Sequence, residues 1–245
     1  MIKIIGERNT GTNYLSKLIK KNLNIKLLNG TAKKIPLLSK LEFYKDLYFK
    51  ITQKNNLGWK HANLNNKNFI NGLRKNSKIK VVILVKNPYS FLLSLKRRPY
   101  HNFNLKNLPF EVFLKSKWKS VSRENTLDFI ESPVELWNNK VRSYFLIKSI
   151  FLEQVLILKY EDLIINPAFQ LKKICDMCKV DFSEHNFLNI KNSTKKDSKT
   201  FNDYLKYYKN DLWIQKLSNR NIKTINEKLD LKLLNKLNYS YLDGK

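Results

Sequence analysis

The sequence predicts an α/β protein of three layers, in which a central parallel sheet is flanked by helices. Short apolar, β-branched runs alternate with helical patterns along the 245 residues. A loop punctuated by glycines directly follows the first of these runs. Hydrophobic residues make up 42% of the chain, which is enough for a sizeable core. This length fits one α/β unit, so we expect a single domain over residues 1–245.

The N-terminal part of the chain is expected to contain two strands and one clear helix. The apolar run at residues 2–5 predicts a buried strand. Residues 13–22 place tyrosine, leucine and isoleucine on one face and predict a helix. The polar stretch that follows allows short helices around residues 38–49. A second short strand is expected at residues 57–60, just before His61.

The same alternation continues through the rest of the chain. Residues 80–85, Lys-Val-Val-Ile-Leu-Val, form the clearest strand, and Pro88 suits the first turn of the helix that follows it. After a long excursion rich in aromatic residues, the expected elements are a helix at 133–151, a strand at 154–158, and helices at 168–179 and 219–237. Strands joined by helices predict a parallel sheet.

Charge and cysteine usage limit the class of protein. Lys and Arg number 47 against 20 Asp and Glu, and this net charge of +27 either favours anionic partners or simply solvates the surface. Cys175 and Cys178 lie in a helical pattern, so we expect core cysteines and no metal site. No secretory signal opens the chain, and the most apolar stretch, residues 144–160, is interrupted by charges. We therefore expect a soluble cytoplasmic protein.

The loop after the first strand is the main candidate binding site. Gly6 and Gly11 have the spacing of the nucleotide-binding P-loop, in which amides at a helix start hold an anion. The P-loop continues with Lys and then Ser or Thr, whereas Thr12 and Asn13 follow here. A Mg²⁺-dependent kinase-like enzyme is therefore disfavoured. The pattern indicates a phosphate site without a metal, or else a glycine turn that only joins strand and helix.

Three segments, in the right order, resemble motifs of the sulfotransferases that use 3′-phosphoadenosine 5′-phosphosulfate (PAPS) as donor. Residues 8–15, Arg-Asn-Thr-Gly-Thr-Asn-Tyr-Leu, resemble the 5′-phosphosulfate loop of that family. Residues 80–94 are similar to its 3′-phosphate segment, in which a serine follows eight residues after a basic residue. Residues 160–167, which begin Tyr-Glu-Asp-Leu and end Asn-Pro, resemble a third signature that follows a core strand. The resemblance implies a PAPS-dependent sulfotransferase.

The resemblance also implies which residues bind the donor. Tyr14 and Tyr160 would contact adenine, although ordinary core packing is the alternative for both. Lys86 and Ser94 would hold the 3′-phosphate, with Lys86 standing where arginine is commoner. The 5′-phosphosulfate would be cradled by Arg8, Asn9, Thr10, Gly11, Thr12 and Asn13.

Two catalytic roles follow from the same comparison. Asn9 stands where the family usually has a lysine that neutralises the leaving oxygen, and Arg8 is the candidate to replace that lysine. His61 is the candidate general base, because the family's cytosolic branch has a histidine after a short strand that carries lysine. His101 and His185 lie in polar loops with no matching context. The acidic residues considered are weaker candidates for the base or structural residues: Glu7, Glu42, Glu161 and Asp162.

The expected acceptor is a hydroxyl of a saccharide or polysaccharide. Several basic residues would line a groove for an acidic glycan or would only be solvated: Lys96, Arg97, Arg98, Lys195, Lys196 and Lys199. Two further alternatives stay open. One is a non-enzymatic nucleic-acid-binding module that uses the positive charge. The other is an inactive relative in which Asn9 in place of lysine has abolished catalysis.

Overall fold

The computed structural model describes residues 1–32, 41–194 and 198–244. The central strands are β1 (Ile2–Gly6), β2 (Lys80–Val85) and β5 (Val155–Lys159), and a separate antiparallel pair consists of β3 (Trp118–Lys119) and β4 (Phe129–Ile130). The helices are α1 (Thr12–Asn22), α2 (Glu42–Asn56), α3 (Lys67–Arg74), α4 (Pro88–Arg97), α5 (Phe110–Lys115), α6 (Pro133–Ile150), α7 (Tyr160–Ile165), α8 (Pro167–Cys178), α9 (Phe201–Lys209), α10 (Asn219–Asn226) and α11 (Leu231–Lys236). Short 3₁₀ turns are η2 (Phe103–Asn107), η3 (Ser122–Glu124), η4 (Glu184–Asn186) and η5 (Ile214–Lys216).

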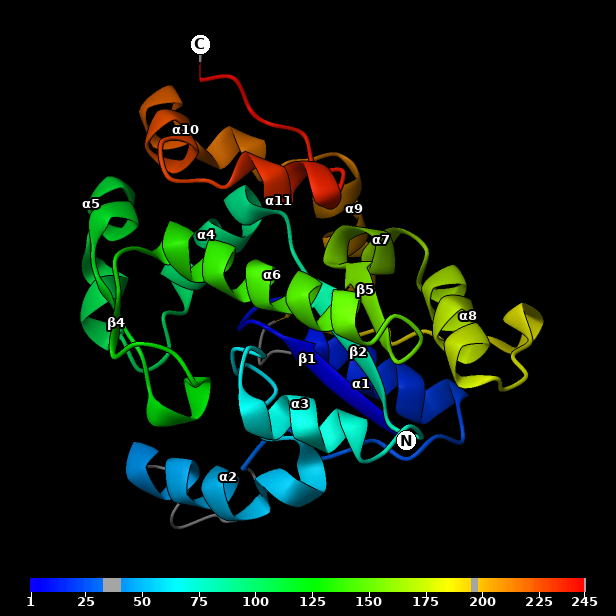
Figure 1. The fold of residues 1–245 in the computed structure, drawn as a ribbon. Coiled ribbons are helices and arrows are strands. Elements are labelled where there is room, and N and C mark those ends of the chain that lie inside the picture. The colour runs from blue at the N-terminus through cyan, green and yellow to red at the C-terminus, as the bar shows by residue number, and fades with distance from the viewer. Residues whose placement is uncertain (33–40, 195–197, 245) are drawn as a thin grey trace.

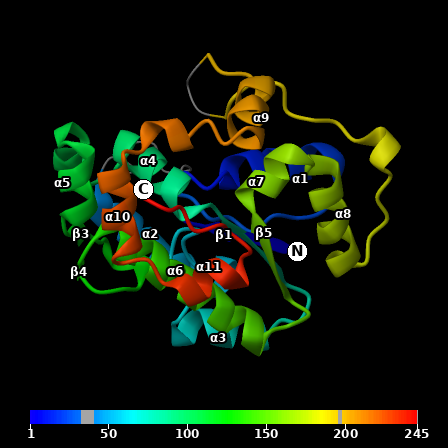
Figure 2. The ribbon, with the colours of Figure 1, turned by 90° about the horizontal axis from the view of Figure 1, so that it is seen from above.

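The central sheet is parallel, with the strand order β1-β2-β5. Ile4 lies opposite Val82, and Val82 lies opposite Leu156. The strands are rich in β-branched residues that are buried from both sides, as expected for a sheet between helix layers. Figure 1 and Figure 2 show α1 on one face of the sheet and α6 on the other. The predicted three-layer α/β fold is therefore confirmed.

The prediction of a strand at residues 57–60 is wrong. Leu57 and Gly58 both have positive φ, 58° and 79°, so the chain turns here instead of extending. The Nζ of buried Lys3, on β1, donates hydrogen bonds to the carbonyl oxygens of Asn29 (2.9 Å), Asn56 (2.5 Å) and Gly58. Burial and nearby Lys60 lower the pKa of Lys3 to about 7. This lysine therefore holds a turn, not a strand, against the edge of the sheet.

Most other predicted elements form within a residue or two of their expected ends. The C-terminal helix expected at 219–237 is an exception, because it divides into α10 and α11, and Asp230 caps the second of these. Around residues 38–49 the structure has the longer helix α2, and residues 38–40 lie outside the described part of the chain. On α8, Cys175 is buried and Cys178 packs against the core, as predicted. Among the described residues, no helix combines the length and the hydropathy needed to cross a bilayer.

Candidate functional site

The carboxyl ends of the three central strands lie at one edge of the sheet, and the candidate site is built there. Gly6 ends β1 in register with Leu84 of β2, and Val85 pairs with Lys159 at the end of β5. The segments that follow these strands are therefore neighbours in space although they are far apart in the sequence. Ligands of open α/β sheets bind at this edge, because the loops diverge there.

Residues 7–11 form the loop between β1 and α1, here called the anion loop. Asn9 and Gly11 have positive φ, 66° and 87°, and the Thr10 hydroxyl donates to the Glu7 carbonyl at 2.6 Å. No side chain caps the first turn of α1, whereas Asn87 and Ser132 cap α4 and α6. The amides at the start of α1 can therefore serve an anionic ligand.

Tyr160 lies directly against the anion loop. A Cβ added at Gly11 would come within 2.5 Å of two carbon atoms of the Tyr160 ring. Tyr14 approaches from α1, stacks on Phe201 at a centroid distance of 6.1 Å and donates its hydroxyl proton to Asn189 Oδ1 at 2.7 Å. Tyr14, Tyr160 and Phe201 line a mainly apolar cavity of about 40 Å³ beside the loop. Both tyrosines predicted to contact adenine thus lie in one place.

The second predicted anion contact forms at the end of β2. The Lys86 ammonium donates to Ser94 Oγ at 2.8 Å, so the two residues eight positions apart do converge. It also donates to the Tyr208 hydroxyl of α9 at 2.7 Å and lies about 5 Å from the ring centroids of Tyr160 and Tyr208. The ammonium is buried beneath these two rings. The Lys86 ammonium thus has Ser94 and Tyr208 as hydrogen-bond partners at the end of β2.

His61 follows the turn held by Lys3 and lies beside the anion loop. Its Nδ1 is 2.5 Å from the carbonyl oxygen of Gly6. Because a carbonyl only accepts, Nδ1 carries the ring proton and Nε2 keeps its lone pair. Burial, together with the charges of Lys60 and Arg8, holds the pKa of His61 well below its usual value. A neutral imidazole with an unprotonated Nε2 is the form that a general base needs.

Lys60 brings a cation to the anion loop from outside it. Its Nζ donates to Asn13 Oδ1 at the start of α1 at 2.7 Å. Asn9, in contrast, is turned away, because its carboxamide bonds to the Arg98 carbonyl at 3.5 Å and to the Tyr100 hydroxyl at 3.4 Å. Tyr100 itself has a positive φ of 56°. A cation at the start of α1 thus comes from the turn before His61.

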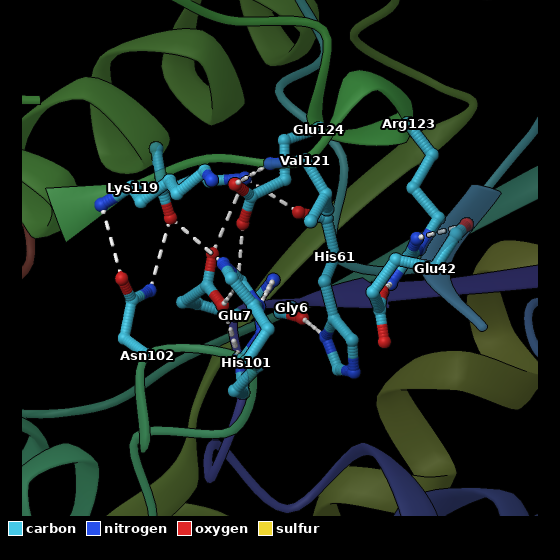
Figure 3. A network of polar contacts seen from close by, with 12 residues as sticks. Gly6, Glu7, Glu42, His61, His101, Asn102, Lys119, Val121, Arg123 and Glu124 are labelled. Carbon is cyan, nitrogen blue, oxygen red and sulfur yellow. Dashed lines mark hydrogen bonds and ion pairs between the residues drawn. The ribbon is translucent and has the colours of Figure 1, made fainter. Parts of the chain in front are cut away.

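Arg8 lies in a buried cluster of charges. Its guanidinium forms ion pairs with Glu7 at 2.7 Å and with Glu124, and Lys140 lies 3.2 Å from the other Glu7 oxygen. Burial would raise the pKa of Glu7, but Lys140 and Arg8 hold it below its usual range. Figure 3 shows Glu7 and Glu124 on neighbouring segments of this cluster, with His101 close by.

This placement disfavours the role expected of Arg8. Two buried carboxylates and the Trp59 ring, 4.7 Å from the guanidinium carbon, already occupy the side chain. Releasing a buried ion pair leaves an uncompensated charge and is costly. The guanidinium is therefore not placed to neutralise a leaving oxygen. For the same reason Glu7, held between Arg8 and Lys140, is not available as a base.

A cavity of about 580 Å³ opens on the side of His61 and Lys60 away from the sheet. Glu42, Lys45 and Phe49 of α2 line one side of it. The Glu42 carboxylate is held by Lys45 at 2.6 Å and by Arg123; burial would raise its pKa, but these cations hold it below its usual value. Tyr100 and His101 line the opposite side, and we refer to this space as the acceptor cavity. Its volume is in the range of small-molecule sites.

Residues 2–228 match the sulfotransferase domain family. The match spans nearly the whole chain, including the anion loop and the Lys86 segment. The chain belongs to the sulfotransferase family. Its predicted classification as a sulfotransferase is thereby confirmed. No curated protein is significantly similar to it in sequence.

Solved structures of similar fold are also sulfotransferases. The sulfotransferase domain of the Synechococcus PCC 7002 olefin synthase has a TM-score of 0.50 and 15% identity, covering 93% of each chain. The domain from the curacin biosynthetic pathway has a TM-score of 0.49 and 15% identity, covering 99% of this chain and 98% of that one. Mouse sulfotransferase SULT7A1 complexed with PAP has a TM-score of 0.48 and 17% identity, and this chain spans 63% of its length. At 15% identity, the likeness to the olefin synthase domain shows the fold alone.

Three residues of the candidate site were not found from the sequence. Tyr208 lies in the C-terminal part of the chain, and no motif connects it with Lys86. Lys60 directly precedes His61 in the sequence, and no motif marks it as a cation for the anion loop. His101 lines the acceptor cavity, donates from Nε2 to the Lys119 carbonyl at 2.7 Å and accepts at Nδ1 from Arg8 at 3.4 Å. Its loop carries no local signal, because only tertiary packing brings it to Arg8.

The other acidic and basic residues considered from the sequence have different environments in the structure. Glu161 is structural as expected, since it accepts from the Tyr239 hydroxyl at 2.7 Å and from the Asn87 amide at 3.1 Å. Among the basic residues, Lys199 lies about 6 Å from the rings of Tyr204 and Tyr207, and Lys96 donates to the Lys106 carbonyl at 2.6 Å. Lys195 and Lys196 lie outside the described residues.

Proposed function

We propose that this sulfotransferase moves a sulfuryl group from PAPS to a hydroxyl of a saccharide. The observation that carries the proposal is the position of two anion contacts at one edge of the sheet. The uncapped start of α1 is one, and the Lys86–Ser94 pair is the other. His61 lies beside the first contact and faces the acceptor cavity. We place the protein in the cytoplasm and assign it no metal.

The donor would bind across the edge of the sheet. Its 5′-phosphosulfate would accept hydrogen bonds from the amides at the start of α1 and from the nearby hydroxyl of Thr12. Its 3′-phosphate would accept from Lys86 and Ser94 in place of the Tyr208 hydroxyl. Adenine would lie against Tyr14 and Tyr160, which line one small cavity beside the anion loop.

The reaction would use His61 as the base. Nε2 takes the proton of the acceptor hydroxyl while the acceptor oxygen attacks sulfur. The bond between sulfur and the phosphate oxygen breaks, and adenosine 3′,5′-bisphosphate leaves with the electron pair. The products are a sulfate ester, the bisphosphate and a protonated His61, which then returns its proton to water. A positioned base of this kind contributes about 10²- to 10⁴-fold in rate.

Lys60 would supply the positive charge that Asn9 lacks. Its ammonium is already at the start of α1, 2.7 Å from Asn13 Oδ1, whereas the Arg8 guanidinium is held by Glu7 and Glu124. Charge placed where negative charge develops on the leaving oxygen stabilises the transition state. On this proposal, Asn9 does not make the protein inactive.

The acceptor cavity supports a polar acceptor with apolar faces, such as a sugar. Glu42, Lys45 and Lys60 offer donors and acceptors for hydroxyl groups. Tyr100 and Phe49 add aromatic surface in the same cavity. Sites of this kind combine a few fixed polar groups with apolar walls, which gives orientation and specificity.

Donor binding is tested by thermal unfolding with millimolar adenosine 3′,5′-bisphosphate in EDTA. A ligand at about 100 times its Kd stabilises by ~2.7 kcal/mol, which for this chain length raises the Tm by about 5–10 °C. We expect Lys86→Ala to remove most of the rise. Lys80→Ala, at the other end of the same strand, is the matched control and should keep it. No rise in the wild-type protein would refute the donor assignment.

Transfer is tested with sulfur-labelled PAPS and a panel of oligosaccharides. The label should enter a saccharide, and His61→Ala should lower kcat about 10²- to 10⁴-fold while leaving the bisphosphate-induced Tm rise unchanged. Lys60→Met should also lower kcat, and Lys20→Met, on the exposed part of α1, is its control. Donor binding without label transfer to any saccharide would contradict the acceptor class but not the donor site.

A further inference from the structure

Helix α2 lines the acceptor cavity on one side. Its other side is exposed, and there Phe43, Leu47 and Lys50 also border a second open cavity of about 530 Å³. Figure 1 shows it at the lower edge of the molecule, outside the layers of the central sheet. Its inner side contributes Glu42, Lys45 and buried Phe49 to the cavity. Its outer side, here called the α2 outer face, consists of Phe43, Tyr44, Leu47, Lys50, Ile51 and Lys54.

The α2 outer face carries an apolar row. Phe43, Leu47 and Ile51 are spaced four residues apart, so they lie one above another on the helix. Phe43 is 72% exposed and Ile51 is 70% exposed, and Leu47 is 41% exposed. Large apolar side chains gathered on one exposed helix face mark an interaction surface more often than singly scattered ones do.

The acidic and the exposed basic residues of α2 lie on different sides of the helix. Both acidic residues of the helix lie toward Arg123. Asp46 pairs with it at 2.7 Å, and Glu42, whose side chain is 38% exposed, pairs with Arg123 and Lys45. The exposed charges on the outer face are Lys50 and Lys54, and no acid accompanies them. The face therefore combines apolar and aromatic side chains with positive charge alone.

We propose that the α2 outer face binds the surface of an anionic lipid bilayer. Interfacial helices combine Phe and Leu-type residues with lysines in this way, so that the apolar row enters the acyl boundary and the ammonium groups meet the headgroups. A net charge of +27 on the whole chain adds long-range attraction to the same surface. A protein partner would have to be acidic at the lysines and apolar at the row, whereas a bilayer supplies both properties at once.

The location of this face bears on the acceptor. Because α2 forms one wall of the acceptor cavity, docking would bring that cavity close to the bilayer surface. On the proposed function, the sulfated hydroxyl would then belong to a saccharide carried on a lipid or lying at the headgroups. The membrane contact itself does not depend on that function.

The test is co-sedimentation of the full chain with vesicles. One set contains phosphatidylcholine alone, and the other contains phosphatidylcholine and phosphatidylglycerol in equal parts. We expect binding to the anionic vesicles, and a loss of about 100-fold in the partition coefficient for Phe43→Ser/Ile51→Ser, since two apolar side chains no longer enter the interface. Lys50→Gln and Lys54→Gln should each lower it about five-fold.

The matched control is Leu152→Ser/Leu188→Ser, which removes two leucines that are 66% and 54% exposed and lie outside α2. The control should bind as the wild type does. Equal binding of both double variants would overturn the proposal, because attraction by total charge would then suffice. A wild type that stays in solution with anionic vesicles would also overturn it. So would a dimer that only Phe43→Ser/Ile51→Ser dissociates, because the face would then be a contact between copies of the chain. The bisphosphate-induced Tm rise, measured on each variant, reports separately on the donor site.

Discussion

Replacement of Glu124 by glutamine tests whether the buried charge cluster stabilises the fold. Arg8, Lys140, Glu7 and Glu124 form a balanced set of two cations and two carboxylates, and all four residues are buried. Glu124→Gln keeps the size of the side chain and an acceptor for the Val121 amide, which lies 3.2 Å from Oε2. It leaves Glu7 as the sole carboxylate between Arg8 and Lys140.

The expected cost follows from that imbalance. Removing one partner of a buried ion pair costs about 3–5 kcal/mol, and the retained hydrogen bonds place this variant near ~3 kcal/mol. For a chain of this length the Tm should fall by about 6–12 °C, measured by calorimetry at neutral pH. Glu131→Gln is the control, because its carboxylate is 74% exposed and lies 4.0 Å from Lys117. A Glu124→Gln protein that unfolds within a degree of the wild type would refute the reasoning.

Three further predictions concern the site. Burial holds the pKa of His61 below 6.5, so the imidazole stays neutral above that pH. The acid limb of the pH profile of kcat/KM should therefore lie below pH 6.5. A midpoint above 6.5 would contradict the assigned environment of His61. The same shift makes stability fall as pH drops below 6.5, since the unfolded chain then binds the additional proton. Gly11→Ala should abolish the bisphosphate-induced Tm rise and lower the free energy of unfolding by ~1–2 kcal/mol, because φ of Gly11 is 87° and the added Cβ meets the Tyr160 ring. An unchanged Tm rise would show that the loop adapts to the added Cβ. Lys3→Met should lower kcat about 10²-fold, because it releases the turn that places Lys60 and His61. The Tm rise with bisphosphate should persist in this variant. An unchanged kcat would show that the turn holds without the Lys3 ammonium.

The sequence alone determined the three strands of the central sheet, most helices and the order of the binding segments. Buried parallel strands read as short β-branched runs, and residues 2–5 and 80–85 have this pattern. Helix starts were also locally encoded, since Pro88 follows the capping Asn87 at the start of α4. Lys86 and Ser94 were predicted to converge for a local reason, because a strand end and the next two helical turns bring them together. Such features depend on neighbours in the chain, and periodicity records them.

Tertiary structure decided which charged groups are available for chemistry. Arg8 stands in the anion loop, but Glu124, 116 residues away, meets its guanidinium and keeps it in the interior. Lys3 occupies a strand position that reads as a break in an apolar run, yet three carbonyl groups from distant residues surround its ammonium. Tyr208 reaches Lys86 across 122 residues. A single sequence records burial through its periodicity, but it does not record which distant side chain neutralises a charge, because that depends on how the layers pack.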